Sequence, residues 1–303
     1  MVGEIFVSTI ARSTQKTLEK IIDDKSDNIE GGAVYKKYLE VRSMDKGFID
    51  FLEMGGTGLA TSKAEGAEIT LGTIREGGLT RIAPTTYAIA LAITEEAFED
   101  GLYPEAIALS RRNKRAMFKT VEYVAASHLA RMFNANFTLG DGLCLGNANH
   151  LLPDGSVFSN IAATAIAPCR QAVIIAKSAV KKYPGHDGLI EGWKLAKIIC
   201  PTEQESVWEG VTESEKAPEP GAFNEINVVK KMKLEVVGIQ YWNNTTTNYA
   251  FQTDADDGAC LYWRRKPRSA SWVDNNNMVM KNSISSRFVV TTIDARGWYC
   301  VNA

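Results

Sequence analysis

The chain has 303 residues, of which 45% are hydrophobic and 23% charged, and its formal net charge is -2. These proportions are typical of a globular protein with a substantial core, and the near-neutral charge excludes a strongly basic nucleic-acid binder. The five cysteines lie far apart without a CxxC pair, which indicates neither a zinc site nor a disulfide framework. No segment reaches the roughly 18 apolar residues of a membrane span. We therefore expect a protein made and folded in a reducing cytosol, without a secretory signal.

The first 46 residues are polar and mostly helical in pattern. Ser13 can cap a short helix that runs to Ile22, and the acidic run Asp23–Asp27 follows. Two interpretations fit this pattern: an arm that packs on a neighbouring molecule, or an ordinary amphipathic terminal helix.

The composition changes between Gly47 and Pro84, where glycine recurs and charges are interleaved. Alternation at Ile69 and Leu71 predicts a loose hairpin with its turn at Gly77–Gly78. A loop of this length without its own core is usually functional or disordered. We expect it to find its burial on a sister molecule, which favours a shell subunit over a self-contained catalyst.

A strand and a very long helix follow this loop. Large and small side chains alternate over Tyr87–Ile93, which predicts a strand, and Thr94 offers a helix N-cap. From Pro104 to Asn136 neither glycine nor a further proline occurs, and apolar residues recur at helical spacing. At about 1.5 Å per residue, such a helix would be a rod roughly 45 Å long.

The remaining chain mixes helices with short strands and predicts an α+β fold. A helix is expected from about Pro168 to Lys182, and a second helix should be capped by Thr202. The run Glu213–Gly221 predicts a polar loop. Strands are expected at Leu143–Leu145, Leu195–Cys200, Met232–Ile239, Asn248–Gln252, Cys260–Trp263 and Phe288–Ile293.

Residues that could carry chemistry do not form a convincing constellation. His150 with Asp154 and Cys144 could form a metal or hydrolytic site, and a hydrolase built on His150 and Asp154 is one alternative. The spacing fits no zinc pattern, so we expect structural roles for these groups and for His128 and His186. We predict no enzymatic activity, no catalytic or metal-binding residues and no cofactor.

The densest basic run on a helix is Arg111–Arg115. It could contact packaged DNA or an acidic arm, whereas the alternative is a solvated helix face. The same alternatives apply to Arg264, Arg265, Lys266 and Arg268. We expect the following aromatic residues to lie in the core: Tyr241, Trp242, Tyr262, Trp263 and Trp272.

Four ordered segments resemble the major capsid proteins of tailed bacteriophages, the shell-forming fold typified by phage HK97, in the branch of the Mu-like major head subunits. The first segment, residues 54–103, begins MGGTGLATSKAEG and looks like that family's extended loop entering its spine helix. The other segments are DGLCLGNANHLLPDGSVFSN, KLAKIICPTEQE and SSRFVVTTIDARGWYC. Together they span most of residues 47–303.

The resemblance implies a division into four parts: an N-terminal arm (1–46), an extended loop (47–93), a peripheral domain with the spine helix (94–160 and 268–303) and an axial domain (161–267). The loop Glu213–Gly221 would be an axial tip. The implied function is a major capsid protein whose pentamers and hexamers form an icosahedral shell around double-stranded DNA. The alternative is an encapsulin-like compartment that packages a cargo enzyme.

The resemblance also implies partners and contact residues. Partners would be further copies of the chain, a separate scaffolding protein, a portal, a decoration protein and DNA held non-specifically, but no membrane. The protein would be located in the virion after assembly in the host cytoplasm. Candidate inter-subunit contacts are Glu53, Lys63, Glu68, Arg75 and Arg81. Candidate loop hinges are Gly55, Gly56, Gly77 and Gly78. A candidate basic face towards DNA or a neighbouring arm is Arg111, Arg112, Lys114 and Arg115.

Overall fold

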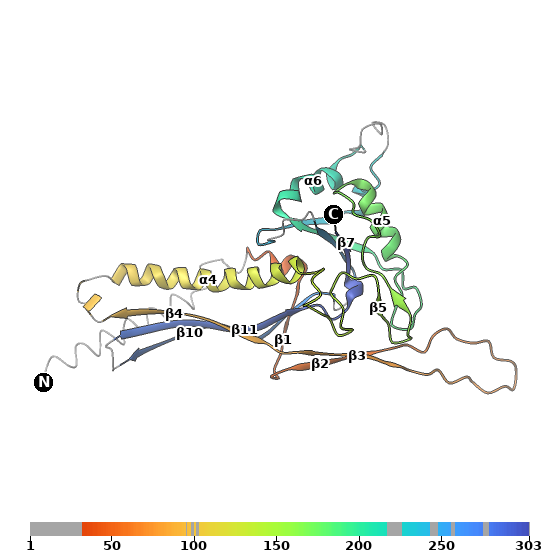
Figure 1. The fold of residues 1–303 in the computed structure, drawn as a ribbon, viewed down its shortest axis with the longest axis horizontal. Helices are drawn as coiled ribbons and strands as arrows, with labels where there is room; N and C mark the ends of the chain where they lie inside the picture. The colour runs from red at the N-terminus through yellow and green to blue at the C-terminus, as the bar shows by residue number, and fades with distance from the viewer. Residues whose placement is uncertain are drawn as a thin grey trace.

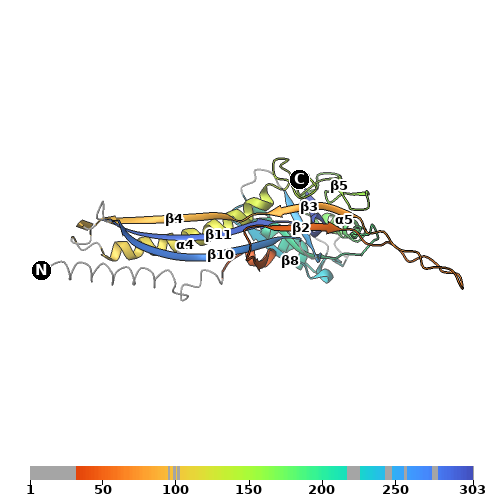
Figure 2. The same cartoon turned by 90° about the horizontal axis from the view of Figure 1, so that it is seen from below.

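The structure is a computed structural model that describes residues 32–94, 96–97, 100, 103–216, 226–242, 248–255, 258–274 and 279–302. The molecule is elongated and has three parts: a long layer of sheet and helix, a lobe above one end of that layer, and a narrow ribbon that projects from the same end (Figures 1 and 2). The helix expected after Ser13, and most of the predicted tip Glu213–Gly221, lie outside the described residues.

The long layer is a four-stranded sheet covered by one helix. Its strand order is β1 (Glu40–Ser43), β10 (Cys260–Asp274), β11 (Val279–Thr291) and β4 (Thr85–Thr94). The pairs β10–β11 and β11–β4 are antiparallel, whereas β1 runs parallel to β10. Helix α4 (Tyr103–Ala130) lies along one face of this sheet (Figure 1).

The two faces of this sheet differ because strand side chains alternate in direction. On β11, Met280, Ile284 and Phe288 are buried and point towards α4, where Met117 and Val121 are also buried. No described helix covers the other side, which we call the open face. It carries mainly small and polar side chains: Thr86, Ala88, Ala90, Arg268, Ala270, Ser283, Ser285 and Arg287.

The lobe contains a second four-stranded sheet. Its strand order is β12 (Trp298–Val301), β9 (Tyr249–Thr253), β7 (Leu195–Pro201) and β8 (Glu235–Ile239). Helices α5 (Arg170–Val180) and α6 (Thr202–Glu213) share one buried cluster with Ile198 and Cys200, so both pack on the same face. At the centre of that cluster Trp208 is fully buried, with its ring centroid 4.9 Å from Tyr249 and 5.6 Å from Phe251.

The projecting ribbon consists of two antiparallel strands, β2 (Ile49–Met54) and β3 (Glu76–Ile82), joined by residues 55–75. The chain reverses in this connection without regular secondary structure. The remaining short elements are α2 (Tyr35–Tyr38), β5 (His150–Leu151), β6 (Val157–Phe158), η1 (Lys230–Met232) and η2 (Ala295–Gly297).

Several predicted elements are confirmed. The strand expected over Tyr87–Ile93 is β4, and the long helix is present, although it ends at Ala130 instead of Asn136. The hydroxyl of Thr94 accepts a hydrogen bond from the N–H of Ala97 at 3.3 Å, as a capping side chain does. The predicted helix between Pro168 and Lys182 is α5, and Trp242, Tyr262 and Trp263 are buried.

Other predictions are wrong, and each error has a local cause. Gly77–Gly78 is not a turn but part of β3. Helix α6 begins at Thr202 itself, with Pro201 in the N-cap position, and no strand forms at Leu143–Leu145 beyond a single bridge at Cys144. Trp272 is not core, because its side chain is 44% exposed on the open face. Strands β10 and β11 are much longer than predicted, because polar side chains on that face hide the alternation.

Strand pairing cuts across the expected domain boundaries. Strand β10 continues through the boundary at 267–268, and β12 pairs with β9 of the lobe although it lies in the segment assigned to the peripheral domain. Strand β4 belongs to the long sheet and not to the loop. No described helix is long and apolar enough to cross a bilayer.

We predict that Trp208→Ala lowers the free energy of unfolding by about 3–5 kcal/mol, because a large buried side chain is removed and a cavity is left. Trp272→Ala is the matched control, since it removes the same side chain from an exposed position and should cost about 0.5 kcal/mol or less. Urea denaturation followed by circular dichroism measures both. Equal losses in the two variants would contradict the assigned core.

Candidate assembly surfaces

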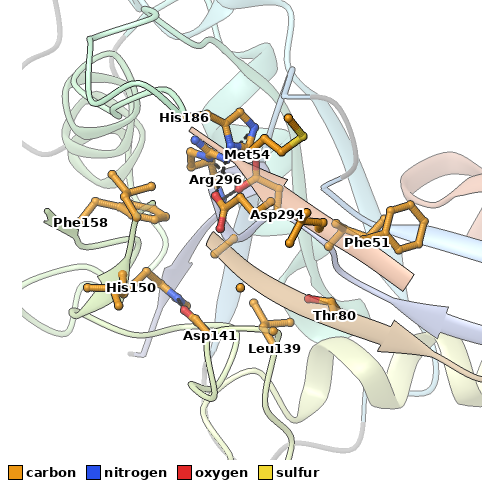
Figure 3. Close-up of a pocket in the computed structure, with 18 of the residues that line it drawn as sticks. Phe51, Met54, Thr80, Leu139, Asp141, His150, Phe158, His186, Asp294 and Arg296 are labelled. Atoms are coloured by element: carbon orange, nitrogen blue, oxygen red, sulfur yellow. Dashed lines mark hydrogen bonds and ion pairs between the residues drawn. The ribbon is translucent and has the colours of Figure 1, made fainter. Parts of the chain in front are cut away.

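The ribbon is held to the body of the molecule at its root through Glu53. The Nη2 of Arg296 lies 3.3 Å from Oε1 of Glu53, and Nδ1 of His186 lies 3.2 Å from the same oxygen. Arg296 is only 1% exposed, and its Nε donates to both carboxylate oxygens of Asp294 at 2.8 Å. We call Glu53, His186, Asp294 and Arg296 the root latch (Figure 3). A buried guanidinium thus orients one strand of the ribbon.

The second strand of the ribbon is held by Arg75. Its Nη1 donates to the main-chain oxygen of Asp154 at 2.9 Å. The hydroxyl and N–H of Ser156 hydrogen-bond the Asp154 carboxylate and, with a smaller contribution from the Arg75 charge, lower the pKa of that carboxyl. The N–H of Gly56 also donates to the main-chain oxygen of His186 at 3.3 Å. Both strands of the root are therefore attached to the body.

Arg81, another predicted inter-subunit contact, is engaged within the ribbon. Its Nε and Nη2 donate to the two carboxylate oxygens of its cross-strand neighbour Asp50 at 2.7 and 2.8 Å. These bonds lower the pKa of Asp50 and raise that of Arg81. The guanidinium also lies 4.5 Å from the ring centroid of Phe48. Glu53, Arg75 and Arg81 thus contact their own chain, and a further role between copies stays a prediction for them.

Glycines near the root allow close approach of other segments. A β carbon at Gly77 would lie 2.8 Å from Cγ of Pro153, and one at Gly56 would lie 2.4 Å from Cβ of Asp187. At such distances any side chain would force the ribbon away from the body. Close contact with the body is a sufficient reason for glycine at Gly56 and Gly77, and no hinge is needed to explain it. A hinge role stays a prediction for the four glycines at Gly55, Gly56, Gly77 and Gly78.

The tip of the ribbon, residues 57–74, is exposed along its whole length. Lys63, Glu65 and Glu68 make no hydrogen bond or ion pair with a described residue. The exposed fractions of the large apolar side chains in the tip are 77% for Leu59, 76% for Ile69, 89% for Leu71 and 56% for Ile74. The tip is therefore an apolar segment whose charged residues are Lys63, Glu65 and Glu68, and the described part of the chain leaves it uncovered.

One face of the ribbon continues this apolar surface. Leu52 and Leu79 are cross-strand partners, and 45% and 57% of their surfaces are exposed. Met54 on the same strand face is 55% exposed. Exposed contiguous apolar surface of this kind marks interaction sites more often than it occurs without function.

A hollow of about 470 Å³ lies between the ribbon root and the body (Figure 3). His150 lines it, but the ring is 1% exposed, with Nδ1 2.5 Å from Asp141 and Nε2 3.1 Å from the main-chain oxygen of Leu145. Asp154 is bonded to Ser156 and not to His150, so the hydrolytic pair considered from the sequence does not form. The described residues contain no group of three or more His, Cys, Asp or Glu side chains that could hold a metal ion.

Burial shifts the pKa values of His128, Cys200 and Cys300 in the direction that favours their neutral forms. Burial, with a smaller contribution from Arg131, lowers the pKa of His128 to about 4, and its Nε2 lies 3.0 Å from the Thr292 hydroxyl. Burial raises the pKa of the Cys200 thiol to about 12 and that of Cys300 further. Such thiols are poor nucleophiles at neutral pH.

Three of the four residues predicted to form a basic face on α4 are exposed. Arg111, Arg112 and Arg115 are exposed, whereas Lys114 is 4% exposed and belongs to the buried side of the helix. The cause is helical geometry, because Lys114 lies two positions from Arg112, which is about 200° of rotation around the helix axis.

A cluster of basic side chains lies on the open face. Sequence analysis identified only some of its members. Arg265 and Arg287 are direct cross-strand partners, and Arg268 pairs with Ser285. Residues three apart in a regular strand point to opposite faces, but an irregularity between Arg265 and Arg268 puts both on the face of Arg287. None of the three forms an ion pair with a described residue. We call Arg265, Arg268 and Arg287 the arginine cluster.

Sequence analysis did not identify Arg296 and Arg287 as candidate functional residues. Arg287 stands among polar and apolar neighbours, and Arg296 has only Asp294 as a charged neighbour, so neither lies in a basic run. Their significance comes from partners that are distant in the chain: Glu53 for Arg296 and Arg265 for Arg287. The segment resemblance included both residues without marking them.

We predict that Glu53→Gln loosens the ribbon root. Losing a charge-assisted hydrogen bond should cost about 1–2 kcal/mol, which corresponds to roughly 5–30-fold more frequent opening. Trypsin cleavage after Arg75, or hydrogen exchange of β3, measures this opening. Glu68→Gln makes the same chemical change in the uncovered tip and should have no effect. Equal protection of wild type and Glu53→Gln would show that the latch does not hold the ribbon.

No protein-family model and no curated protein sequence matches the chain. Several solved structures do match it. The capsid of a native GTA particle is 14% identical, with 89% of each chain covered and a TM-score of 0.55. The virus-like particle from Pyrococcus furiosus is 7% identical, covering 95% of this chain and 98% of that one, with a TM-score of 0.52.

The capsid of Myoviridae phage XM1 is similar to the chain at 11% identity, covering 90% of this chain and 92% of the phage chain, with a TM-score of 0.51. At these identities the likeness concerns the backbone arrangement, and coverage near the full length includes the layer, the lobe and the ribbon. The chain therefore has the α+β fold of HK97-like capsid proteins, and the assignment to a Mu-like branch goes beyond what these matches support.

Proposed function

We propose that the chain is the subunit of an icosahedral shell, built from pentamers and hexamers, that encloses double-stranded DNA in a virion. The observation that carries this proposal is the uncovered ribbon tip, because the described part of the chain leaves more than half of the surface of each large apolar side chain exposed: Leu59, Ile69, Leu71 and Ile74. In a chain with a capsid-type fold, the natural partner for such a segment is another copy. The structural neighbours are a virus-like particle, a phage capsid and the capsid of a GTA particle, which supports the same interpretation.

The open face of a neighbouring copy is a complementary surface for the tip. It offers small side chains, including Ala88, Ala90 and Ser283, against which large apolar side chains can pack closely. It also offers the arginine cluster, while the tip carries Glu65 and Glu68 without partners. Like charges placed directly across a pair of strands are unfavourable alone. Carboxylates from a second copy would relieve that repulsion.

The remaining expectations are part of the proposal. Arg111, Arg112 and Arg115 on α4 are candidates for DNA or neighbour contact, since they are exposed without ion pairs to described residues. A separate scaffolding protein, a portal and a decoration protein are expected from the resemblance. Assembly in the host cytoplasm is expected for the same reason.

Deleting residues 57–74, with a short glycine linker in their place and Gly56 and Arg75 kept, should leave a folded chain that does not form shells. The deletion removes only exposed residues, so circular dichroism and the urea midpoint should stay close to wild type. Electron microscopy of the purified protein measures the outcome. Regular closed particles from the deleted chain would show that the tip is not needed.

Charge reversal tests the proposed acceptor surface. Glu65→Arg with Glu68→Arg should reduce particle yield at least about tenfold, because two attractions become repulsions worth on the order of 1 kcal/mol each. Adding Arg265→Glu and Arg268→Glu to the same chain should restore the yield. Sedimentation separates particles from free subunits.

The matched control for this exchange is Arg111→Glu with Arg112→Glu on the opposite side of the layer. It has the same charge change and should not rescue the tip variant. Rescue by both pairs would show that only net charge matters. Nuclease-protected nucleic acid inside wild-type particles supports the DNA-filled shell, whereas a protein cargo without nucleic acid would favour the encapsulin-like compartment.

A further inference from the structure

The two helices of the lobe carry opposite charges. Between residues 202 and 215, which include α6, there are five glutamates and no lysine or arginine. Between residues 168 and 182, which include α5, the charged residues are one arginine and three lysines. The segment around α6 is therefore acidic and the segment around α5 is basic, although the net charge of the whole chain is only -2.

Several charged side chains on or beside the two helices form no ion pair within the described part of the chain. Glu203, Glu209 and Glu213 on α6 form no ion pair with a described residue. The same holds for Lys181 and Lys182 at the end of α5. On the flank next to β8 the acidic charge is partly offset. There Lys230 lies 3.2 Å from Glu215, and Lys230 and Lys233 line a hollow with Glu209 and Glu213.

Each helix also presents a narrow strip without bulky polar groups. On α6 the strip contains Val207, which is 48% exposed, and Gly210, where no atom lies within 4 Å of the position of a β carbon. On α5 it contains exposed Ser178 and partly exposed Ile174. The helices have 12 and 11 residues, so they match each other in length at about 17 Å.

The positions of the helices determine what kind of contact they can make. Figure 1 shows α6 and α5 on opposite lateral sides of the lobe, and both rest on the same face of one sheet. Two different surfaces on opposite sides of a rigid body form head-to-tail contacts, which close into rings when the rotation allows. A contact between two identical surfaces would instead bring acidic α6 against acidic α6.

We propose that the acidic face of α6 in one copy docks on the basic face of α5 in the next copy, and that this contact closes the rings of the shell. The inference rests on the proposed function and extends it by assigning a surface, a polarity and a partner, which is a second copy of this chain. Val207 and Gly210 would lie against Ile174 and Ser178, with the glutamates beside the lysines. Charge complementarity would fix the direction of the ring.

Cross-linking tests this contact directly. Val207→Cys and Ser178→Cys are combined in a chain that also carries Cys169→Ser, because the other four cysteines are buried. A short bismaleimide should then give a ladder on a denaturing gel that rises from dimers and stops at pentamers and hexamers. Each single cysteine variant should stay monomeric on the same gel.

Gly210→Trp provides a second test. The site is open in the single chain, so folding should be retained, but the indole would separate the two helices. The cross-linked ladder should fall at least tenfold. Gly210→Ala is the control and should leave the ladder unchanged. Equal thermal midpoints for the three proteins would show that the loss is not caused by unfolding.

The outcomes separate the two proposals. Wild-type particles without a ladder, or a ladder that ends at dimers, would overturn the docking of α6 on α5 and leave the shell function standing. An unchanged ladder in Gly210→Trp would also overturn it. A wild-type chain that stays monomeric at every concentration and forms no particles would overturn both proposals.

Discussion

The structure depends on one constraint: the ribbon tip cannot bury its own apolar side chains. Leu59, Ile69, Leu71 and Ile74 would each contribute about 1.5–3 kcal/mol if they were fully buried, but a two-strand ribbon has no interior to bury them. A single hairpin is marginal in water even with a good apolar face. Burial of these side chains therefore needs a surface beyond the described part of the chain, and the other features of the fold are consistent with delivering the tip there.

The root latch separates two functions along the same ribbon. Close to the body, Glu53 and Arg75 are held by a buried guanidinium and by a main-chain oxygen, which fixes where the ribbon points. Farther out, every residue from 57 to 74 is exposed. Because the root fixes the direction of the ribbon, the exposed tip loses less conformational entropy when it docks.

Sequence patterns predicted those elements in which local pattern and burial agree. Strand β4 alternates large and small residues, and the long helix lacks glycine and proline, so both were recognised. Strands β10 and β11 were underestimated because one face is buried under α4 while the other carries arginine, serine and alanine. The irregularity that places Arg265 and Arg268 on one face is a property of pairing and leaves no local signal. Likewise Glu53 could be selected as a charge in a loop, but its partner Arg296 lies 243 residues away.

The contacts inferred for this chain are individually modest, and that property suits a closed shell. Ordering an exposed loop and desolvating glutamates and arginines offset much of what apolar burial contributes. A copy that docks its tip on one neighbour and its α6 on another is held at several points at once, and each contact raises the effective concentration for the next. Single misplaced contacts can then dissociate, whereas a copy seated on all sides is retained. Opposite charges on α5 and α6 add direction to this selection, because a reversed copy would bring like charges together.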